Sequence, residues 1–389
     1  MNVQPSRFWE IEGLRAWLAW TVVVSHLFIT LNVQDFGLGY FAPLAGAHAV
    51  SIFIMISGFV IAGLVIEQQE SWPRYILRRA FRIYPAYLVA LAVGAAATPL
   101  ALQGLVATSW GGDPNSYYVS SLREGLASTE AHPWTHWALH LTLLQGVMPD
   151  NVLPWSSVAF VGPAWSLSLE WQFYLIAPAL MWALRSPSWR APVVIVAFAC
   201  AVLFERGVFG TYSAPSTLLG GLWLFVIGMG CRLALPALKT TALPLSALAL
   251  GAFGFGLLRP DLFPVAVWLA FFVLLMRPAP TGIIDRGVAA AAKVLFASPL
   301  AAALGARSYS VYIIHIPIMK LLLYALPLQA MTQWQALGCL AATALPLTLL
   351  ASELLFRFVE RPMIRLGQRL ASTRRTAVAT PSASQRATP

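Results

Sequence analysis

Residues 46–66 read GAHAVSIFIMISGFVIAGLVI, a run that holds no Asp, Glu, Lys or Arg. Because the hydrocarbon core of a bilayer is about 30 Å thick, a helix of about 20 apolar residues is long enough to cross it. This run therefore predicts a transmembrane helix. The whole chain agrees, since 59% of its 389 residues are hydrophobic and only 10% are charged. An ordinary soluble domain carries about a quarter charged residues, so the composition excludes a soluble globular protein.

Nine further stretches resemble membrane spans, which predicts an all-α, polytopic bundle of about ten transmembrane helices. The predicted spans are 13–33, 46–66, 84–107, 164–184, 190–206, 215–235, 241–259, 262–276, 309–328 and 334–356. The stretch 134–148 is short and contains His136 and His140, so we expect an interfacial or re-entrant helix there. The Ala-rich stretch 288–304 contains Lys293 and is expected to lie on the membrane rather than to cross it.

The basic residues indicate the orientation of this bundle. Ten spans with a cytosolic N-terminus place 21 of the 25 Lys and Arg residues in cytosolic segments and three outside. Lys320 alone falls within a span. This bias follows the positive-inside rule, which predicts that both termini are cytosolic. It also accounts for the formal net charge of +10, so no nucleic-acid partner is expected.

A single transmembrane domain is expected over residues 1–370, with its largest external segment at 108–163. Residues 371–389 are rich in Ser, Thr, Ala, Arg and Pro, which predicts a disordered cytosolic tail. Glu10 and Glu12 precede the first span and no small-residue cleavage site follows it. We therefore expect a retained first helix and not a cleaved signal peptide.

Ionisable side chains inside a span are candidate functional groups, because each costs about 2.5–3.5 kcal/mol to insert. Arg15 and His26 of the first span lie eleven positions apart, which brings them to within about 20° of one helical face. A rise of about 1.5 Å per residue puts His26 roughly 16 Å beyond Arg15, in the outer half of the membrane. The alternative is a structural histidine that forms a hydrogen bond between helices.

Glu170 is the second ionisable group at depth. It lies roughly 9–10 Å from the external end of the span 164–184. A lone carboxylate in hydrocarbon must be protonated or paired, and His26, at a similar depth, is the expected partner. The alternative is a structural role in which Glu170 forms hydrogen bonds with Ser166 and Ser168.

An arginine cluster follows the second span, in the segment RYILRRAFRIYPAY at 74–87. Arg79 and Arg82 are spaced i,i+3, with Arg78 beside them, and Pro85 is expected to mark a change of direction. Arginine binds phosphate through two parallel hydrogen bonds, so the cluster fits a phosphate site. A topology determinant or a lipid-headgroup contact accounts for the same composition.

Two other patterns are weaker. In SYSVYIIHIP, at 308–317, two tyrosines and a histidine share one helical face, which predicts a packed, hydrogen-bonded stripe. Its members are Tyr309, Tyr312 and His315. Three histidines of the external segment have a spacing that could bind a metal, but no Cys or acid completes the set, so no metal site is expected. They are His132, His136 and His140.

Together these segments resemble the acyltransferase-3 family of membrane acyltransferases, from residue 8 to about 367. Six segments in the right order make the resemblance specific. They are EGLRAWLAWTVVVSH, IFIMISGFVIAGL, RYILRRAFRIYPAY, PAWSLSLEWQFYLIAP, ARSYSVYIIHIP and VERP. The aliphatic IFIMISGF departs from the family, in which this stretch is usually rich in Phe.

The resemblance implies ten spans and transfer of an acyl group, often acetyl, from cytosolic acyl-CoA to a hydroxyl on an extracytoplasmic or membrane-linked acceptor. Such acceptors are commonly surface polysaccharides. Carried over by position, the family's Arg-x10-His pair falls on Arg15 and His26, and its Arg-x-x-Arg motif on Arg79 and Arg82. The acid of the fourth span falls on Glu170.

The expected mechanism combines these residues. Arg15, Arg78, Arg79 and Arg82 would bind the acyl-CoA. His26 would act as general base toward the acceptor hydroxyl, and a nearby acid would orient it. The expected acid is Glu170. A transporter is the alternative, because polar residues in a helix bundle also mark a substrate path. No inverted repeat is visible in the sequence, and the arginines suit a phosphate-bearing donor better.

The external segment 108–163 is rich in Trp, Tyr, Gly and Asn, as in WGGDPNSYY at 110–118. These side chains suit a carbohydrate or lipid-linked glycan acceptor, and an aromatic belt at the membrane surface accounts for them equally well. Membrane lipid is the other expected partner. The expected location is a bacterial inner membrane.

Overall fold

The computed structural model describes residues 8–33, 38–68, 70–111, 116–238, 245–276 and 282–372. Within these ranges the chain is helical, and no strand is present. The first eight α-helices are α1 (Trp9–Thr30), α2 (Leu38–Gln68), α3 (Trp72–Val106), α4 (Tyr117–Ala131), α5 (Pro133–Leu141), α6 (Ala164–Arg185), α7 (Pro187–Glu205) and α8 (Leu218–Leu238). The remaining α-helices are α9 (Leu245–Leu258), α10 (Phe263–Leu275), α11 (Ile283–Ala297), α12 (Pro299–Ala306), α13 (Ser308–Ala325), α14 (Gln333–Leu355) and α15 (Arg361–Ser372).

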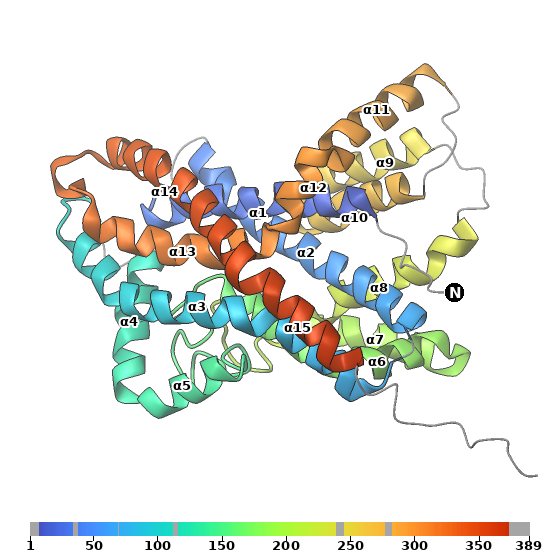
Figure 1. Ribbon diagram of the computed structural model, residues 1–389, viewed down its shortest axis with the longest axis horizontal. Coiled ribbons are helices and arrows are strands. Elements are labelled where there is room, and N and C mark those ends of the chain that lie inside the picture. Colours follow the sequence, from blue (N-terminus) through green and yellow to red (C-terminus); the bar gives the residue numbers. More distant parts are fainter. Residues whose placement is uncertain are drawn as a thin grey trace, which may run out of the picture.

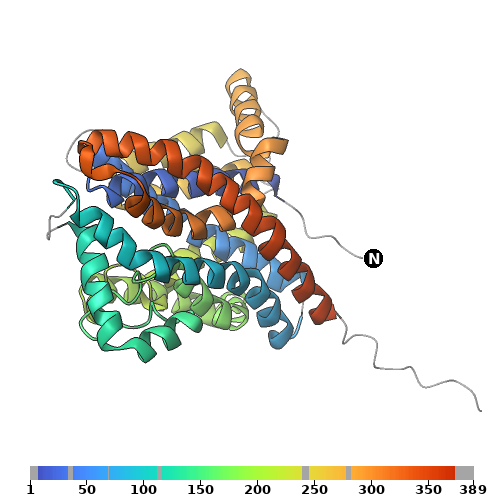
Figure 2. The same ribbon diagram turned by 60° about the vertical axis from the view of Figure 1, so that its left-hand side comes forward.

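The arrangement is a bundle in which helices distant in sequence pack side by side. Helix α2 packs against α1 and α8, and α13 packs against α3 and α14 (Figure 1). Helix α14 continues through a π-helical turn, Phe356–Glu360, into α15. The two form one continuous rod across the front of the molecule in both views, and α15 packs on α3 (Figure 2). The predicted disordered tail lies outside the described residues from 373 onward.

All ten predicted spans fall on helices, but the number of spans is not confirmed. Seven helices are long and apolar enough to cross a membrane, or eight if the pair α11–α12, bent by 41°, is one span. Helices α9 and α10 have only 14 and 13 residues, below the roughly 17 that a span needs. Helix α6 has 22 residues but is too polar to count among the seven. Several apolar helices nevertheless establish an integral, multi-pass membrane protein.

Some segments differ from the sequence-based expectation. Helix α3 begins at Trp72, before the predicted start at 84, and contains Pro85 in its interior. The external segment includes a 15-residue helix, α4, that its polar composition did not predict. Helix α5 has nine residues, about 14 Å at 1.5 Å per residue, and is too short to cross a bilayer.

Glycines allow the central helices to approach closely. A Cβ atom on Gly228 of α8 would overlap the carbonyl oxygen of Met55 on α2, and one on Gly58 of α2 would overlap that of Phe225 on α8. The backbones of α2 and α8 therefore touch at two reciprocal points. Small residues at such crossings are how transmembrane helices pack tightly without a hydrophobic driving force from water.

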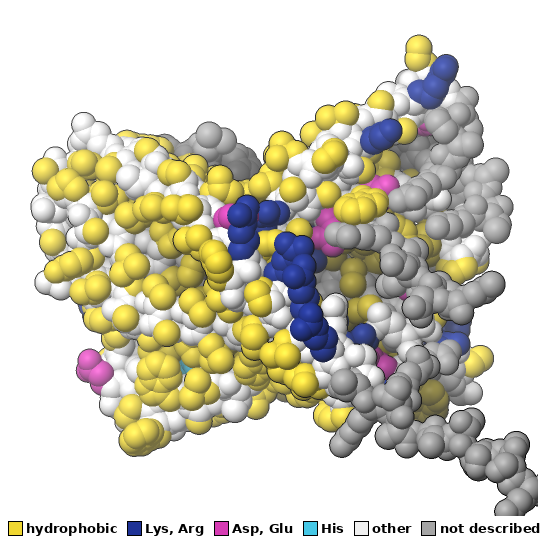
Figure 3. All heavy atoms as spheres, viewed as in Figure 1, with side chains coloured by type: hydrophobic (Ala, Val, Ile, Leu, Met, Phe, Trp, Pro, Cys, Tyr) yellow, Lys and Arg dark blue, Asp and Glu magenta, His cyan; other side chains and the backbone are white. Residues whose placement is uncertain are grey.

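The molecular surface is largely apolar, as expected for a chain surrounded by lipid (Figure 3). On the face shown, Lys and Arg side chains gather in a band in front of the bundle. The exposed arginines of α15 and the turn before it are Arg357, Arg361, Arg365 and Arg369.

Candidate functional site

Two cavities inside the bundle contain the ionisable residues singled out from the sequence. The first, about 130 Å³, lies between α1, α2, α3, α6 and α13 and is lined by Arg15, Arg79, Arg82 and Glu170. The second, about 440 Å³, contains His26 of α1. Arg15 and His26 therefore line successive cavities along one helix, as their shared face predicts. Other residues of the second cavity are Ser25, Tyr117, Tyr118, Trp165 and Lys320.

The two cavities meet at a common wall. Val50 of α2 and Tyr312 of α13 line both of them. The Tyr312 hydroxyl lies 2.8 Å from the Ser166 hydroxyl and 3.2 Å from the carbonyl oxygen of Pro163. Tyr312 is thereby fixed between α13 and the start of α6.

The arginines of the cluster on α3 have different surroundings. Arg78 forms an ion pair with Glu70 and a hydrogen bond with Gln68 and does not line the first cavity. The structure thus does not bring Arg78 together with Arg79 and Arg82. Arg79 lies over the Tyr174 ring, 5.9 Å from its centroid. Its Nε is buried without a hydrogen-bond partner, and no carboxylate among the described residues pairs with it.

The other two arginines of the cavity have acidic partners. Arg82 forms an ion pair with Glu360 and lies over the Tyr309 ring at 5.6 Å. Arg15 lies 3.8 Å from Glu12, its i,i+3 neighbour on α1. Arg79 is therefore the guanidinium of this cavity that is free to bind an external anion.

Glu170 has partners other than those expected. Its Oε1 accepts hydrogen bonds from Ser57 of α2 at 2.7 Å and from Tyr174 at 2.5 Å. Neither His26 nor Ser166 is among its hydrogen-bond partners. The expected pair between Glu170 and His26 is thus not formed, although both residues lie within the bundle. Helix α6 packs on α2, which places the carboxylate in the first cavity instead.

His26 is instead paired with His315 of α13. Nε2 of His315 lies 3.3 Å from Nδ1 of His26, and the ring centroids are 5.0 Å apart. Nδ1 of His26 also lies 2.8 Å from the carbonyl oxygen of Val22, and Nδ1 of His315 lies 3.2 Å from that of Val311. A carbonyl oxygen only accepts, so these contacts assign the N–H to Nδ1 in both rings.

This tautomer leaves the second nitrogen of His26 available for chemistry. With Nδ1 protonated, Nε2 carries the lone pair of the neutral ring. Among the described residues, no side chain or carbonyl forms a hydrogen bond with it. His26 therefore presents a basic nitrogen beside the second cavity, while His315 and Val22 hold the ring.

The tyrosine stripe is hydrogen-bonded, which confirms the expectation for 308–317. Tyr309 donates to the carbonyl oxygen of Ile83 at 2.6 Å, and Tyr312 contacts Ser166 as described above. Further along α13, the buried Lys320 donates to Thr98 at 2.8 Å and to the carbonyl oxygen of Phe160 at 2.9 Å. These bonds attach the segment before α6 to α3 and α13.

The histidines of the external segment do not converge on one point. His136 is hydrogen-bonded to Ser128 at 2.9 Å, and Nδ1 of His140 lies 2.8 Å from the carbonyl oxygen of His136. His132 is exposed. Burial lowers the pKa of His140 to about 3 and also lowers the pKa of His136. Both rings are thus buried as neutral groups, and the described residues contain no cluster suited to a metal ion.

The aromatic stretch 110–118 is divided between two places. Tyr117 and Tyr118 line the second cavity, whereas Trp110 donates to the carbonyl oxygen of Met331. Residues 112–115 lie outside the described residues. Among the residues of this stretch that the structure describes, Tyr117 and Tyr118 are the ones that contribute to the cavity.

Sequence reasoning did not predict the contacts of several residues in or beside the two cavities. Tyr174 lies at i,i+4 from Glu170, a spacing that places the two on one helical face. Ser57 of α2 has no distinctive pattern in the sequence, and the spacing at 308–317 indicates His315 only as part of a packed stripe, because local spacing does not reveal a partner on another helix. Glu360 belongs to VERP, which the sequence analysis used only as a family marker.

Comparison with known proteins agrees with this architecture. A family model described as an acyltransferase domain matches residues 8–353. The chain is 27% identical to acyltransferase MdmB of Streptomyces mycarofaciens over 92% of each chain. It is 25% identical to peptidoglycan O-acetyltransferase OatA of Listeria monocytogenes, over 92% of this chain and 56% of OatA. Nodulation protein 10 of Rhizobium leguminosarum is 26% identical over 58% of this chain and 59% of its own. No solved structure matches the chain.

Proposed function

This chain belongs to the acyltransferase-3 family and is a membrane acyltransferase, and we propose that it moves an acyl group from acyl-CoA to a carbohydrate hydroxyl. The observation that supports this most directly is the pair of adjoining cavities. One contains arginines and the other a neutral histidine, and both are lined by Val50 and Tyr312. Donor and acceptor can then approach from opposite sides of one thin wall.

The first cavity suits the phosphates and the arm of an acyl-CoA. Arg79, without an acidic partner, can bind a phosphate through charge-assisted hydrogen bonds, and Arg82 and Arg15 add to the positive field. The remaining wall is largely apolar and suits an acyl chain and its linker. Apolar lining residues include Phe53, Ile54, Ile56, Val60 and Phe225. Acetyl-CoA is the simplest donor of this class.

His26 is the general base of the proposed reaction. An alcohol is a weak nucleophile until its proton is accepted. The acceptor oxygen attacks the thioester carbonyl as Nε2 of His26 takes the hydroxyl proton. The carbon–sulfur bond then breaks, and the CoA thiolate leaves and recovers a proton. His315, rather than Glu170, orients the base, and Glu170 offsets the positive charge of the arginine cavity.

The second cavity suits a carbohydrate acceptor. Tyr117, Tyr118 and Trp165 provide aromatic faces, and Ser121 and Ser213 provide hydroxyl groups. OatA, by its name, acetylates peptidoglycan, which supports a surface or lipid-linked glycan as acceptor here. A bacterial inner membrane gives access to cytosolic acyl-CoA on one side and to such glycans on the other.

A reconstituted assay tests the proposed function. The purified protein is placed in lipid vesicles with acetyl-CoA labelled in the acetyl group and with candidate glycans. We expect free CoA thiol and labelled glycan in equal amounts, and neither with His26→Ala. Movement of the glycan across the vesicle without release of CoA would instead identify a transporter. Failure of wild-type protein to release CoA with any acceptor would contradict an acyl-CoA donor.

A further inference from the structure

The π-helical turn between α14 and α15 changes which residue faces the bundle. Along α14 the buried positions recur at helical spacing: Ala336, Leu340, Ala344, Thr348, Ser352 and Leu355. An uninterrupted α-helix would next bury residue 359, which is Val359. The turn Phe356–Glu360 instead widens the helix, so that Glu360 is buried with 1% of its surface exposed. Turns of this kind are rare and often occur at functional sites.

The buried carboxylate of Glu360 is held from two sides. One oxygen forms an ion pair with Arg82 of α3, and the other accepts a hydrogen bond from Ser310 of α13 at 2.6 Å. Three helices that are distant in sequence therefore meet at this carboxylate. A Cβ atom on Gly367 of α15 would collide with the Phe81 side chain of α3, so this side chain packs directly on the α15 backbone about two turns beyond Glu360.

Arg82 is consequently the most constrained arginine of the first cavity. Its guanidinium is fixed by Glu360 on one side and lies over the Tyr309 ring on the other. Arg79 has no carboxylate partner among the described residues, and the Arg15 guanidinium lies 3.8 Å from the Glu12 carboxylate. A guanidinium held in one geometry loses less conformational entropy when a ligand binds than a free one does.

We propose that Glu360 is a positioning residue that holds Arg82 toward the donor in the first cavity. Arg79 and Arg82 then have unequal roles: Arg79 is the mobile cation that closes on the anion, and Arg82 is the fixed one. Glu360 itself contacts no substrate. This inference rests on the proposed function, since it takes the ligand of the first cavity to be the phosphate-bearing acyl-CoA.

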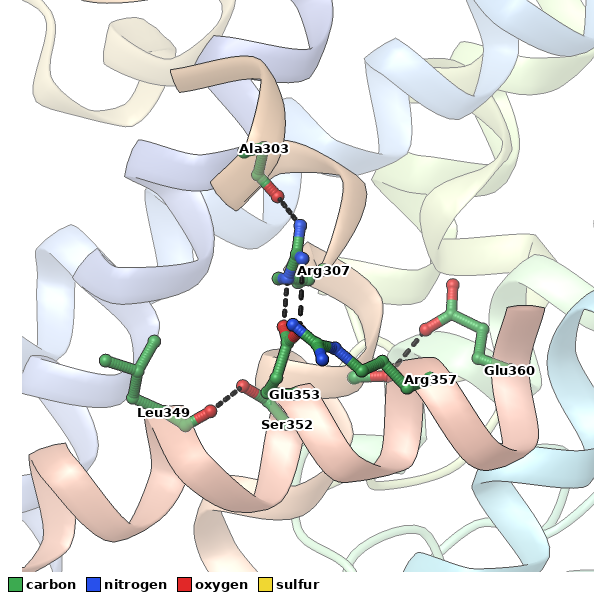
Figure 4. Close-up of polar contacts among 8 residues, drawn as sticks. Ala303, Arg307, Leu349, Ser352, Glu353, Arg357 and Glu360 are labelled. Atoms are coloured by element: carbon green, nitrogen blue, oxygen red, sulfur yellow. Dashed lines mark hydrogen bonds and ion pairs between the residues drawn. The ribbon is translucent and has the colours of Figure 1, made fainter. Parts of the chain in front are cut away.

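Glu353 provides a matched control on the same helix end. It lies seven positions before Glu360 and pairs with two arginines, Arg307 and Arg357 (Figure 4). Neither of these arginines lines the first cavity. Glu353→Gln thus removes two Arg–carboxylate ion pairs from the same rod without touching the cavity.

The test measures binding of labelled acetyl-CoA and steady-state kinetics for full-length protein in vesicles. Glu360→Gln is expected to raise the Kd and KM for acetyl-CoA about tenfold, the effect of misplacing one charge-assisted hydrogen bond, with kcat within about twofold. Glu360→Asp keeps the charge and should recover most of the loss. Ser310→Ala should raise the Kd about two- to threefold. Glu353→Gln should leave the Kd within about twofold of wild type.

A double variant shows whether Glu360 acts through Arg82. If it does, Arg82→Gln combined with Glu360→Gln binds acetyl-CoA no more weakly than Arg82→Gln alone. Additive losses in the double variant, an unchanged Kd in folded Glu360→Gln, or equal losses in Glu353→Gln would each overturn the positioning role. Should Glu360→Gln not fold, Ser310→Ala decides the question, and wild-type affinity in that variant would overturn the positioning role. If wild-type protein does not bind acetyl-CoA, the proposed donor itself is wrong.

Discussion

Nε2 of His315 on α13 lies 3.3 Å from Nδ1 of His26 on α1. This contact joins two segments that are 289 positions apart in sequence and places a second imidazole behind the proposed base. His315 is fully buried, so it cannot itself contact an acceptor in the second cavity. In the proposed mechanism, His315 holds the ring of His26 with the Nε2 lone pair directed away from His315.

Replacement of either histidine should reduce transfer to different extents. His26→Ala is expected to lower kcat by about 10²- to 10⁴-fold, the usual contribution of a general base. His315→Asn should lower it by about tenfold, because Nδ1 of His26 keeps its bond to Val22 and loses only one partner. The measurement is release of CoA in the presence of acceptor. His48 is a third histidine of the bundle and lines neither cavity, so His48→Ala should release CoA at the wild-type rate. A wild-type rate in His315→Asn would show that the contact between the two histidines has no part in the mechanism.

Replacing Arg79 and replacing Arg78 on α3 should have different effects on donor binding. Arg79→Gln removes the cation that has no acidic partner and is expected to raise the KM for acetyl-CoA about tenfold or more. Arg78→Gln removes a cation already paired with Glu70, so its KM should remain within about twofold of wild type. Steady-state kinetics at saturating acceptor compare the two. Equal effects would show that general positive charge, and not the geometry of the cavity, binds the donor.

The contact between α2 and α8 should be sensitive to a single methyl group. Gly228→Ala is expected to destabilise the protein by about 1–3 kcal/mol, because the added carbon overlaps the Met55 carbonyl oxygen and overpacking costs this much. Gly230→Ala lies on the same helix with no atom within 4 Å of the new carbon and should not destabilise. Thermal unfolding in detergent measures both. Equal melting temperatures for the two variants would contradict the close approach of these helices.

Acid should destabilise the external segment through its buried histidines. Burial lowers the pKa of His140 from the ordinary 6.5 to about 3. Between these values the unfolded chain binds a proton that the folded protein does not, so stability falls as the pH drops below about 6.5. The loss for one histidine approaches about 1.4 kcal/mol per pH unit.

Thermal unfolding between about pH 4 and pH 7 measures this slope. His140→Gln should reduce the dependence by about one proton. The exposed His132 is the matched control, and His132→Gln should leave the dependence close to that of wild type. A pH dependence unaltered by His140→Gln would mean that His140 is protonated in the folded protein.

The sequence predicts the positions of the long apolar helices well, and their ends and packing partners less well. Long apolar runs mark helices because hydrocarbon demands internal hydrogen bonding of the backbone. Apolar runs do not show where a helix continues into a more polar, amphipathic segment. Helix α3 therefore begins at Trp72, well before the predicted 84, with the arginine cluster inside it. Helices α9 and α10 are apolar, but they are shorter than a full span.

The partner of His26 shows the limit of sequence reasoning at the site. The position of a residue along a helix gives its depth in the membrane, and by this measure Glu170 and His26 lie at similar depths. Depth does not say which helices are neighbours or how each is rotated. Helix α1 packs on α13 and helix α6 on α2, so the two groups line different cavities. The π-helical turn adds a register shift that no local composition indicates.

The wall formed by Val50 and Tyr312 also has an electrical consequence, because it separates two polar cavities within the membrane. Where water-filled or polar cavities enter from both sides, the transmembrane voltage drops mainly across the thin layer that remains. Moving one phosphate charge across that layer involves about 2.3 kcal/mol per 100 mV, whereas an uncharged acyl group crosses with no electrical work. In the proposed reaction, this partition would keep the charged carrier on its own side and let only the neutral acyl group change sides.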